Sequence, residues 1–261
     1  MAPINGIDIH HETQGDGPTI VFVHGLGATS NAWHAQRTTL SKNYRVIVYD
    51  RSGCGRSGRA RDGYSVEAWT EELAGLMDHL AVPSAVVVGH SLGSMIAQRF
   101  AAQYATRTEA LILAGGEAEL GPEEKEALTE RARSVETDGL ISVVGDWLAA
   151  VLSAATREAN PALAGLVREM FLSNDPTSYA LHCLALRDGA VRDDQGNIAC
   201  PTLLTVGDQD LVTPMSWQRQ IAAGIADSRI RIIPNTAHMT MLESPAVFNT
   251  VVLEFLAALQ R

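Results

Sequence analysis

Ser91 is the residue whose surroundings most clearly predict chemistry. It stands at the centre of a Gly-His-Ser-Leu-Gly sequence at residues 89–93, between a β-branched apolar run and a stretch with helical spacing. A serine on such a sharp strand-to-helix turn is forced towards an unfavourable backbone conformation, and glycines two residues away on either side relieve close contacts. The pattern therefore predicts a nucleophilic serine whose hydroxyl projects from the turn.

Leu92 is expected to be the first residue of the helix that follows this turn. The backbone N–H groups of a first helical turn have no partner within the helix, and the positive end of the helix dipole lies beside them. We therefore expect the Leu92 amide to stabilise the oxyanion that forms when a serine attacks a carbonyl carbon. An ordinary strand-to-helix turn with small residues remains the alternative interpretation of the motif taken alone.

The elements that must position this turn are visible as short apolar runs rich in β-branched residues, which predict buried strands. They lie at residues 19–23, 46–49, 85–88, 111–113, 203–206 and 230–233. Helical spacing occurs at residues 66–80, 92–104 and 245–260. Alternation of strands and helices predicts an α/β fold with a parallel sheet and right-handed crossovers.

Residues 117–199 interrupt this alternation and are rich in helical patterns, with Pro122 and Pro161 at expected helix starts. Because the segment falls between two predicted strands, we expect it to lie over their carboxyl ends, where open α/β sheets bind ligands. The predicted organisation is a core of residues 1–116 and 200–261 with a helical cap of residues 117–199. The alternative is that this segment only completes the core.

From about residue 7 to residue 259 the chain resembles the α/β-hydrolase family of serine hydrolases. The resemblance rests on the Ser91 turn, on the sequence His-Gly-Leu-Gly at residues 24–27, and on the segments at residues 49–57, 206–214 and 233–239. It implies the α/β-hydrolase fold, a mostly parallel central sheet flanked by helices, with a helical cap inserted after the strand at residues 111–113.

The resemblance also implies a catalytic triad of Ser91, Asp210 and His238, in the order along the chain that the family shows. His238 would take the Ser91 proton and return it to the leaving group, while Asp210 would hold the histidine tautomer and stabilise the imidazolium. Asp208, two residues before Asp210, is one alternative for the acid. Glu117 is another, because some α/β-hydrolases take their acid from the earlier strand.

The His-Gly segment resembles the family's oxyanion loop and implies the Leu26 backbone N–H as a second donor beside that of Leu92. On this interpretation His24 is structural. Trp33, which follows the loop, is a candidate for the wall of the substrate pocket, with ordinary packing as the alternative.

Two segments of the predicted cap, at residues 131–140 and 170–179, resemble the cap of 3-oxoadipate enol-lactonases and their relatives. The implied reaction is hydrolysis of a small carboxylic ester or lactone through an acyl-enzyme, without a metal or cofactor. Arg187 and Arg192 are candidates to hold a substrate carboxylate, and solvated surface arginines are the alternative.

Other functions stay open on the same residues: hydrolysis of a C–C or amide bond, cofactor-free perhydrolysis, and a ligand-binding signal receptor that retains the triad. Epoxide and haloalkane hydrolysis are disfavoured because the turn holds Ser91 where those reactions need an aspartate.

Composition excludes further classes of function. A net charge of −10 over 261 residues argues against a nucleic-acid partner, because phosphate binding depends on clustered Lys and Arg. No apolar run is long enough to span a membrane, and the first residues do not resemble a signal peptide, so a cytoplasmic protein with a small-molecule substrate is expected.

Three widely spaced cysteines (Cys54, Cys183 and Cys200) indicate neither a disulfide framework nor a zinc site. A monomer and a homo-oligomer remain equally open.

Overall fold

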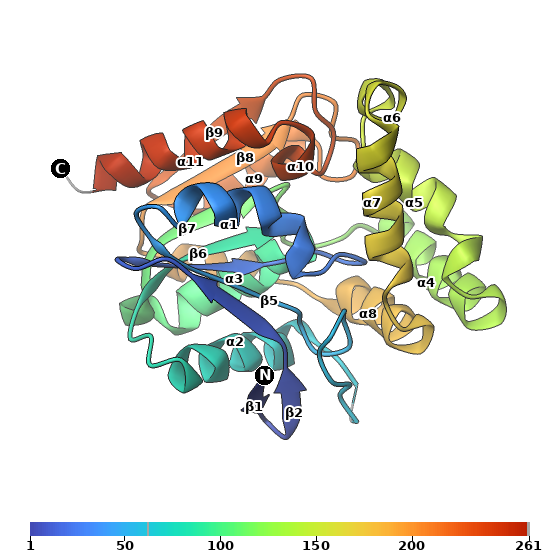
Figure 1. The fold of residues 1–261 in the computed structure, drawn as a ribbon, viewed down its shortest axis with the longest axis horizontal. Helices are drawn as coiled ribbons and strands as arrows, with labels where there is room; N and C mark the ends of the chain where they lie inside the picture. The colour runs from blue at the N-terminus through green and yellow to red at the C-terminus, as the bar shows by residue number, and fades with distance from the viewer. Residues whose placement is uncertain (62, 260–261) are drawn as a thin grey trace.

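The computed structural model describes residues 1–61 and 63–259 and has a seven-stranded sheet at its centre (Figure 1). The strand order is β3-β5-β4-β6-β7-β8-β9, and every neighbouring pair is parallel except β3 and β5. These strands are β3 (His11–Gln14), β4 (Thr19–Val23), β5 (Arg45–Tyr49), β6 (Ala85–His90), β7 (Thr108–Ala114), β8 (Thr202–Gly207) and β9 (Ser228–Ile233). β1 (Ala2–Ile4) and β2 (Ile7–Ile9) form a separate antiparallel pair.

All six predicted strands are present. The central ones are buried between layers of helices, whereas β9 at the edge of the sheet is largely accessible to solvent. Every residue of β6 and β8 is buried. The strand predicted at residues 111–113 is longer than expected and spans Thr108–Ala114. β1, β2 and β3 are short and partly polar, so their sequences did not indicate strands.

Helices cover both faces of the sheet (Figure 1). On one side lie α1 (His34–Leu40) and α11 (Pro245–Leu259), and on the other α2 (Val66–His79) and α3 (Leu92–Gln103). α9 (Met215–Gly224) connects β8 to β9, and the single turn α10 (Thr240–Glu243) lies between β9 and α11. The helices predicted at residues 66–80, 92–104 and 245–260 are confirmed to within one residue, except that residue 260 lies outside the described residues.

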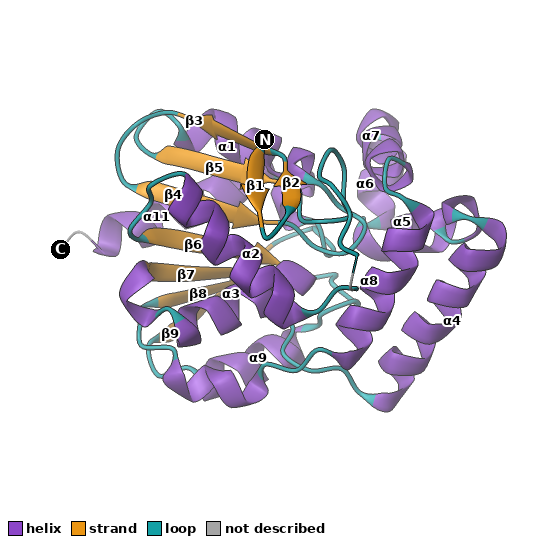
Figure 2. Cartoon of the chain, turned by 90° about the horizontal axis from the view of Figure 1, so that it is seen from below, coloured by secondary structure: helices purple, strands orange, loops and turns teal. Residues whose placement is uncertain are grey.

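Five helices lie between β7 and β8 and gather at one end of the sheet (Figures 1 and 2). They are α4 (Pro122–Asp138), α5 (Val144–Val151), α6 (Ala154–Ala159), α7 (Pro161–Leu172) and α8 (Pro176–Asp188). Proline begins α4 and α7 as predicted, because its missing N–H costs nothing in a first helical turn. The two ends of this segment meet, since the Val191 N–H donates to the Ala118 carbonyl oxygen at 2.8 Å. We call residues 117–199 the cap segment.

None of the helices within residues 1–61 and 63–259 has the length and apolar character to cross a membrane. Within the same residues no group of three or more His, Cys, Asp or Glu side chains is placed to hold a metal ion.

Candidate active site

Ser91 occupies the turn between β6 and α3 with a left-handed backbone, at φ 53° and ψ −126°. Such a conformation is strained for a residue with a side chain, and it persists only where the surroundings enforce it. A Cβ atom at Gly89 would clash with the Gly93 carbonyl oxygen, and one at Gly93 would clash with the Val23 carbonyl oxygen. The two glycines of the motif are therefore sterically required, as the sequence predicted.

Asp210 and His238 form a buried pair in the loops that follow β8 and β9. The Asp210 Oδ2 atom lies 2.9 Å from His238 Nδ1 and also accepts a hydrogen bond of 2.9 Å from the Thr213 hydroxyl. The other carboxylate oxygen, Oδ1, accepts the backbone N–H groups of Val212 and Thr213, both at 2.9 Å. The carboxylate is thus fully hydrogen-bonded and points one oxygen at the histidine.

Each member of this pair shifts the pKa of the other. Burial alone would raise the pKa of Asp210, but the nearby His238 charge and the hydrogen bonds outweigh it and hold that pKa well below its usual value. Burial would lower the pKa of His238, and the attraction of Asp210 outweighs that effect and raises it. Asp210 is therefore ionised near neutral pH and favours a proton on the imidazole.

The two alternative acids occupy different places. Asp208 is exposed, and its Oδ1 accepts the Thr236 backbone N–H at 3.2 Å, so it supports the loop after β9. Glu117 is buried beside Ser91, with no hydrogen bond to His238, and its Oε1 atom has no partner in the described part of the chain. Burial raises the pKa of Glu117 to about 7.

A cavity of about 260 Å³ lies between the core and the cap segment. Ser91 and His238 line its core side, and Glu117, the first residue of the cap segment, also lines it. Its walls are mostly apolar. From the cap segment come Leu128, Trp147 and Leu186, and from the core side come Leu26, Leu211 and Trp217. Ser91 is 7% exposed, so the cavity is the route by which a small molecule reaches its hydroxyl.

The loop that carries Leu26 lies against the Ser91 turn. A Cβ atom at Gly25 would stand 2.9 Å from both Ser91 Cβ and His90 Nδ1, so only glycine allows this approach. Neither the Leu26 nor the Leu92 backbone N–H donates to a protein acceptor among the described residues. Both predicted oxyanion donors are therefore free and belong to segments that meet at Ser91.

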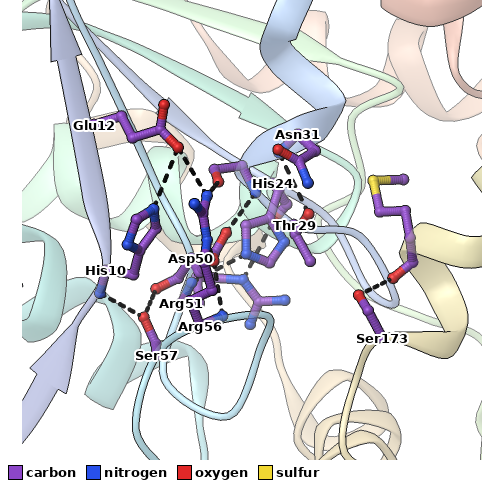
Figure 3. A network of polar contacts seen from close by, with 12 residues as sticks. His10, Glu12, His24, Thr29, Asn31, Asp50, Arg51, Arg56, Ser57 and Ser173 are labelled. Carbon is purple, nitrogen blue, oxygen red and sulfur yellow. Dashed lines mark hydrogen bonds and ion pairs between the residues drawn. The ribbon is translucent and has the colours of Figure 1, made fainter. Parts of the chain in front are cut away.

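A network of buried polar groups supports the loop that begins at His24 and carries Leu26; His24, Asp50 and Arg51 belong to this network (Figure 3). His24 Nε2 accepts the Arg51 backbone N–H at 3.0 Å, and the Arg51 guanidinium donates to the carbonyl oxygens of His24 and Gly25 at 3.2 and 3.1 Å. Asp50 accepts the backbone N–H groups of Ser30 and Arg56. Burial and the Arg51 charge lower the pKa of His24 to about 3, so it stays neutral in this structural position.

His90, the variable position of the motif, was not singled out from the sequence. Its Nε2 donates to the His238 carbonyl oxygen at 3.2 Å, and the two imidazole centroids lie 4.6 Å apart. Burial lowers the pKa of His90 well below its usual value, so it is a neutral donor. It ties the Ser91 turn to the loop that carries His238. Thr213, which orients Asp210, was also missed.

The expectation that Trp33 lines the pocket is wrong. Its side chain is fully buried, its ring centroid lies 4.9 Å from that of Phe22, and it is not among the residues around the cavity. It ends a short 3₁₀ helix, Ser30–Trp33, whose turn directs the indole into the core between β4 and α11.

The two arginines that were candidates for carboxylate binding, Arg187 and Arg192, also lie outside the cavity. Arg187 pairs with Asp188 at 2.7 Å and Arg192 pairs with Glu119 at 3.1 Å, and neither lines the cavity that contains Ser91. The cavity instead contains Arg131 from α4, which the sequence did not single out for this role.

Comparison with known proteins agrees with this geometry. Residues 20–251 match the model of the alpha/beta hydrolase family. The chain belongs to the α/β-hydrolase family. This confirms the predicted fold and the resemblance, and it identifies the protein as a hydrolase of that family.

Three similar proteins show which activities occur among its relatives. The crystal structure of the enol-lactonase from Burkholderia xenovorans LB400 is 30% identical with a TM-score of 0.92, and the match covers 98% of this chain and 99% of that one. A thermophilic esterase from Thermogutta terrifontis, in a malate-bound structure, is 29% identical with a TM-score of 0.93, covering 98% and 95%. A Caulobacter sp. (strain K31) protein whose name provisionally assigns it as carbamate hydrolase RutD is 28% identical, covering 95% and 96%.

Proposed function

We propose that this α/β-hydrolase cleaves small carboxylic esters or lactones through an acyl-enzyme on Ser91. The observation that carries the proposal is that His238, held by the buried Asp210, and the strained Ser91 turn line one cavity. A serine hydroxyl is a weak nucleophile at its ordinary pKa, and a histidine held in one tautomer by a carboxylate is the arrangement that activates it.

The reaction follows from the positions of these groups. His238 takes the Ser91 proton as the oxygen attacks the substrate carbonyl carbon, and the Leu26 and Leu92 amides stabilise the resulting oxyanion. Collapse of the intermediate breaks the bond to the leaving alcohol, which receives the proton from His238. Water, deprotonated by His238, then attacks the acyl-enzyme and releases the carboxylic acid and Ser91. In a lactone the alcohol remains attached to the acyl chain.

The cavity supports a small substrate with a substantial apolar part. Its volume of about 260 Å³ is below the usual range of pockets that take drug-sized ligands, and Leu128, Trp147 and Leu186 close its cap side. The enol-lactonase and esterase relatives support this substrate class. We further propose that the cap segment, residues 117–199, acts as a cap domain over the core.

A second candidate is hydrolysis of an amide or carbamate bond, which the similarity to the Caulobacter protein favours. The same triad serves both reactions, and they differ in the group that His238 must protonate as it leaves. Hydrolysis of C–C bonds, perhydrolysis and ligand binding without turnover are tested by separate assays: cleavage of diketones, peroxide-dependent halogenation and ligand-induced thermal stabilisation.

The test is a substrate panel applied to the wild type and to Ser91→Ala. It contains p-nitrophenyl esters of two to six carbons, unsubstituted lactones of five and six ring atoms, p-nitroanilides and N-alkyl carbamates. Hydrolysis of the small esters or lactones that disappears in Ser91→Ala supports the proposal. Turnover confined to the anilides or carbamates favours the second candidate, and no Ser91-dependent hydrolysis of any member overturns both.

A further inference from the structure

Asn174, which follows α7, connects the cap segment to the loop that carries Leu26. Its side chain is buried, and its Nδ2 atom donates to the Gly27 carbonyl oxygen at 3.1 Å. The same NH₂ group also donates to the Met170 and Phe171 carbonyl oxygens at the end of α7, at 3.2 and 2.9 Å. Three carbonyl oxygens around one position require a donor there. A side chain without such a donor therefore breaks the bond between the cap segment and the loop.

Two hydrogen bonds thus hold the backbone on either side of Leu26. From the core, the Arg51 guanidinium donates to the Gly25 carbonyl oxygen at 3.1 Å. From the cap segment, Asn174 donates to the Gly27 carbonyl oxygen. The Gly25 carbonyl and the Leu26 N–H belong to one planar peptide unit, so the first bond sets the plane of this N–H. The second bond holds the chain just beyond Leu26, so that the loop cannot swing away from the nucleophile.

Side-chain packing adds to this connection, because Gly27 lies directly against the cap segment. A Cβ atom at Gly27 would stand 2.7 Å from Phe171 Cδ2 and 3.2 Å from Tyr179 Cε2. Phe171 in turn packs against Trp147, with ring centroids 4.5 Å apart, and Trp147 lines the cavity. A displacement of the cap segment is therefore transmitted to Gly27 by contact as well as by the hydrogen bond from Asn174.

The junction between α7 and α8 is anchored to the core by further bonds. Asp175 pairs with Arg59 at 2.8 Å, and the Tyr64 hydroxyl donates to Ser178 Oγ at 3.1 Å. The Asp175 carboxylate also accepts the Ser178 backbone N–H at 2.8 Å, which caps the start of α8. These bonds do not involve Asn174, so replacing Asn174 alone is expected to leave the junction in place.

We propose that Asn174 is a positioning residue for the oxyanion site: its hydrogen bond to Gly27 holds the Leu26 N–H where it meets the developing oxyanion. The cap segment then contributes to catalysis besides enclosing the substrate, because the oxyanion site is complete only while the α7–α8 junction lies against the core. This inference rests on the proposed attack by Ser91 and adds a residue that supports it. Because an oxyanion donor acts by being fixed before the reaction, a loosened donor lowers the rate without weakening substrate binding.

The test variant is Asn174→Ser. Its hydroxyl can still donate to the carbonyl oxygens at the end of α7, but the side chain is one bond shorter than asparagine and does not reach Gly27. We expect kcat on p-nitrophenyl butyrate to fall by about ten- to a hundred-fold with KM changed by less than about two-fold, since removing an oxyanion donor outright costs about 10²–10³-fold. Asn174→Gln, which keeps an amide donor, is expected to recover part of the loss.

Two measurements distinguish positioning from a general structural effect. Affinity for butyl trifluoromethyl ketone, whose adduct with Ser91 places an oxyanion at the same site, should fall in Asn174→Ser by the same factor as kcat. The acid limb of the pH profile should stay where it is in the wild type, because Asp210 and His238 are untouched. A thermal melt establishes that each variant is folded.

Ser173→Ala is the matched control. The Ser173 hydroxyl donates to the Met170 carbonyl oxygen at 2.7 Å (Figure 3), so this variant weakens the same helix end and leaves the bond to Gly27 in place. Its kcat, KM and affinity for the ketone are expected to change by less than about two-fold. An unchanged kcat in folded Asn174→Ser, or an equal loss of kcat in the two variants, would overturn the inference.

The rate at which a fluorophosphonate labels Ser91 separates this inference from the proposed reaction, because the phosphoryl oxygen of the reagent occupies the oxyanion site during attack. If the wild type hydrolyses no ester but labelling is slower in Asn174→Ser than in Ser173→Ala, the inference stands and the proposed reaction falls. If Ser91-dependent ester hydrolysis and labelling are both unaffected by Asn174→Ser, the proposed reaction stands and the inference falls.

Discussion

Replacing Asp210 with asparagine separates the proposed triad from the two alternative acids. In the wild type Oδ1 accepts two backbone N–H groups, and Oδ2 faces His238 Nδ1 at 2.9 Å. The asparagine carbonyl oxygen must take the Oδ1 position, since an NH₂ group there would oppose two backbone donors. Its NH₂ group then faces the histidine and donates to Nδ1. This fixes the proton on Nε2, the nitrogen that has to accept the proton of Ser91.

The expected magnitude follows from that tautomer. A triad histidine held in the wrong tautomer loses about 10⁴-fold in kcat while the fold persists. Asp210→Asn is therefore predicted to lose about 10⁴-fold in kcat on p-nitrophenyl butyrate, with little change in KM. Asp208→Asn is the matched control, because Asp208 is exposed and accepts only the Thr236 N–H, and roughly two-fold or less is expected there.

The assay is steady-state hydrolysis, with circular dichroism and a thermal melt of each variant to establish that it is folded. Retention of more than a tenth of the wild-type kcat by a folded Asp210→Asn protein refutes the reasoning. A 10⁴-fold loss in Glu117→Gln instead would move the role of the acid to the earlier strand.

The same geometry makes five further predictions. The kcat/KM for ester hydrolysis falls as pH drops through the His238 pKa, which lies above its ordinary value near 6.5, because the base must be neutral; a pH profile without an acid limb would contradict this. Glu117→Gln moves that limb to lower pH, because ionised Glu117 helps to raise the His238 pKa. The same variant raises Tm by a few degrees at pH 8 and by less at pH 5. Burial raises the pKa of Glu117 to about 7, so the folded protein loses stability as pH rises towards that value, and removing the carboxyl restores more stability at the higher pH. An equal change in Tm at both pH values would refute this reasoning. Gly25→Ala lowers kcat by about 10²-fold, because its Cβ meets Ser91 and displaces the Leu26 amide, whereas a wild-type rate would show that this amide is not needed. Trp33→Phe lowers the free energy of unfolding by about 1–3 kcal/mol in denaturant titrations without changing the order of preference among esters, and a changed order would return Trp33 to the pocket wall.

Sequence predicted the catalytic end of the fold well because that region is constrained locally. The strands around Ser91 are buried on both faces, so their apolar runs are continuous, and the sharp turn requires glycine at positions 89 and 93. Asp210 and His238 follow strand ends, and parallel strands bring such loops to one edge of the sheet. The structure places them together as the resemblance implied.

The cap side was not predictable in the same way, because it depends on how helices pack across long separations in sequence. Arg131 was missed since no periodicity reports which face of α4 meets the cavity. The pairing of Arg192 with Glu119 depends on closure of the cap segment, while that of Arg187 with the adjacent Asp188 was visible in the sequence. Trp33 was misplaced because proximity along the chain to the oxyanion loop does not fix the direction of a side chain.

The most direct measurement of the central claim is covalent labelling of the native enzyme with a fluorophosphonate, followed by peptide mass spectrometry. The account predicts one phosphonyl group per chain, on Ser91, with loss of ester hydrolysis in proportion to labelling and no label on Ser91→Ala. Labelling at another residue, or full hydrolytic activity after complete modification of Ser91, would contradict it.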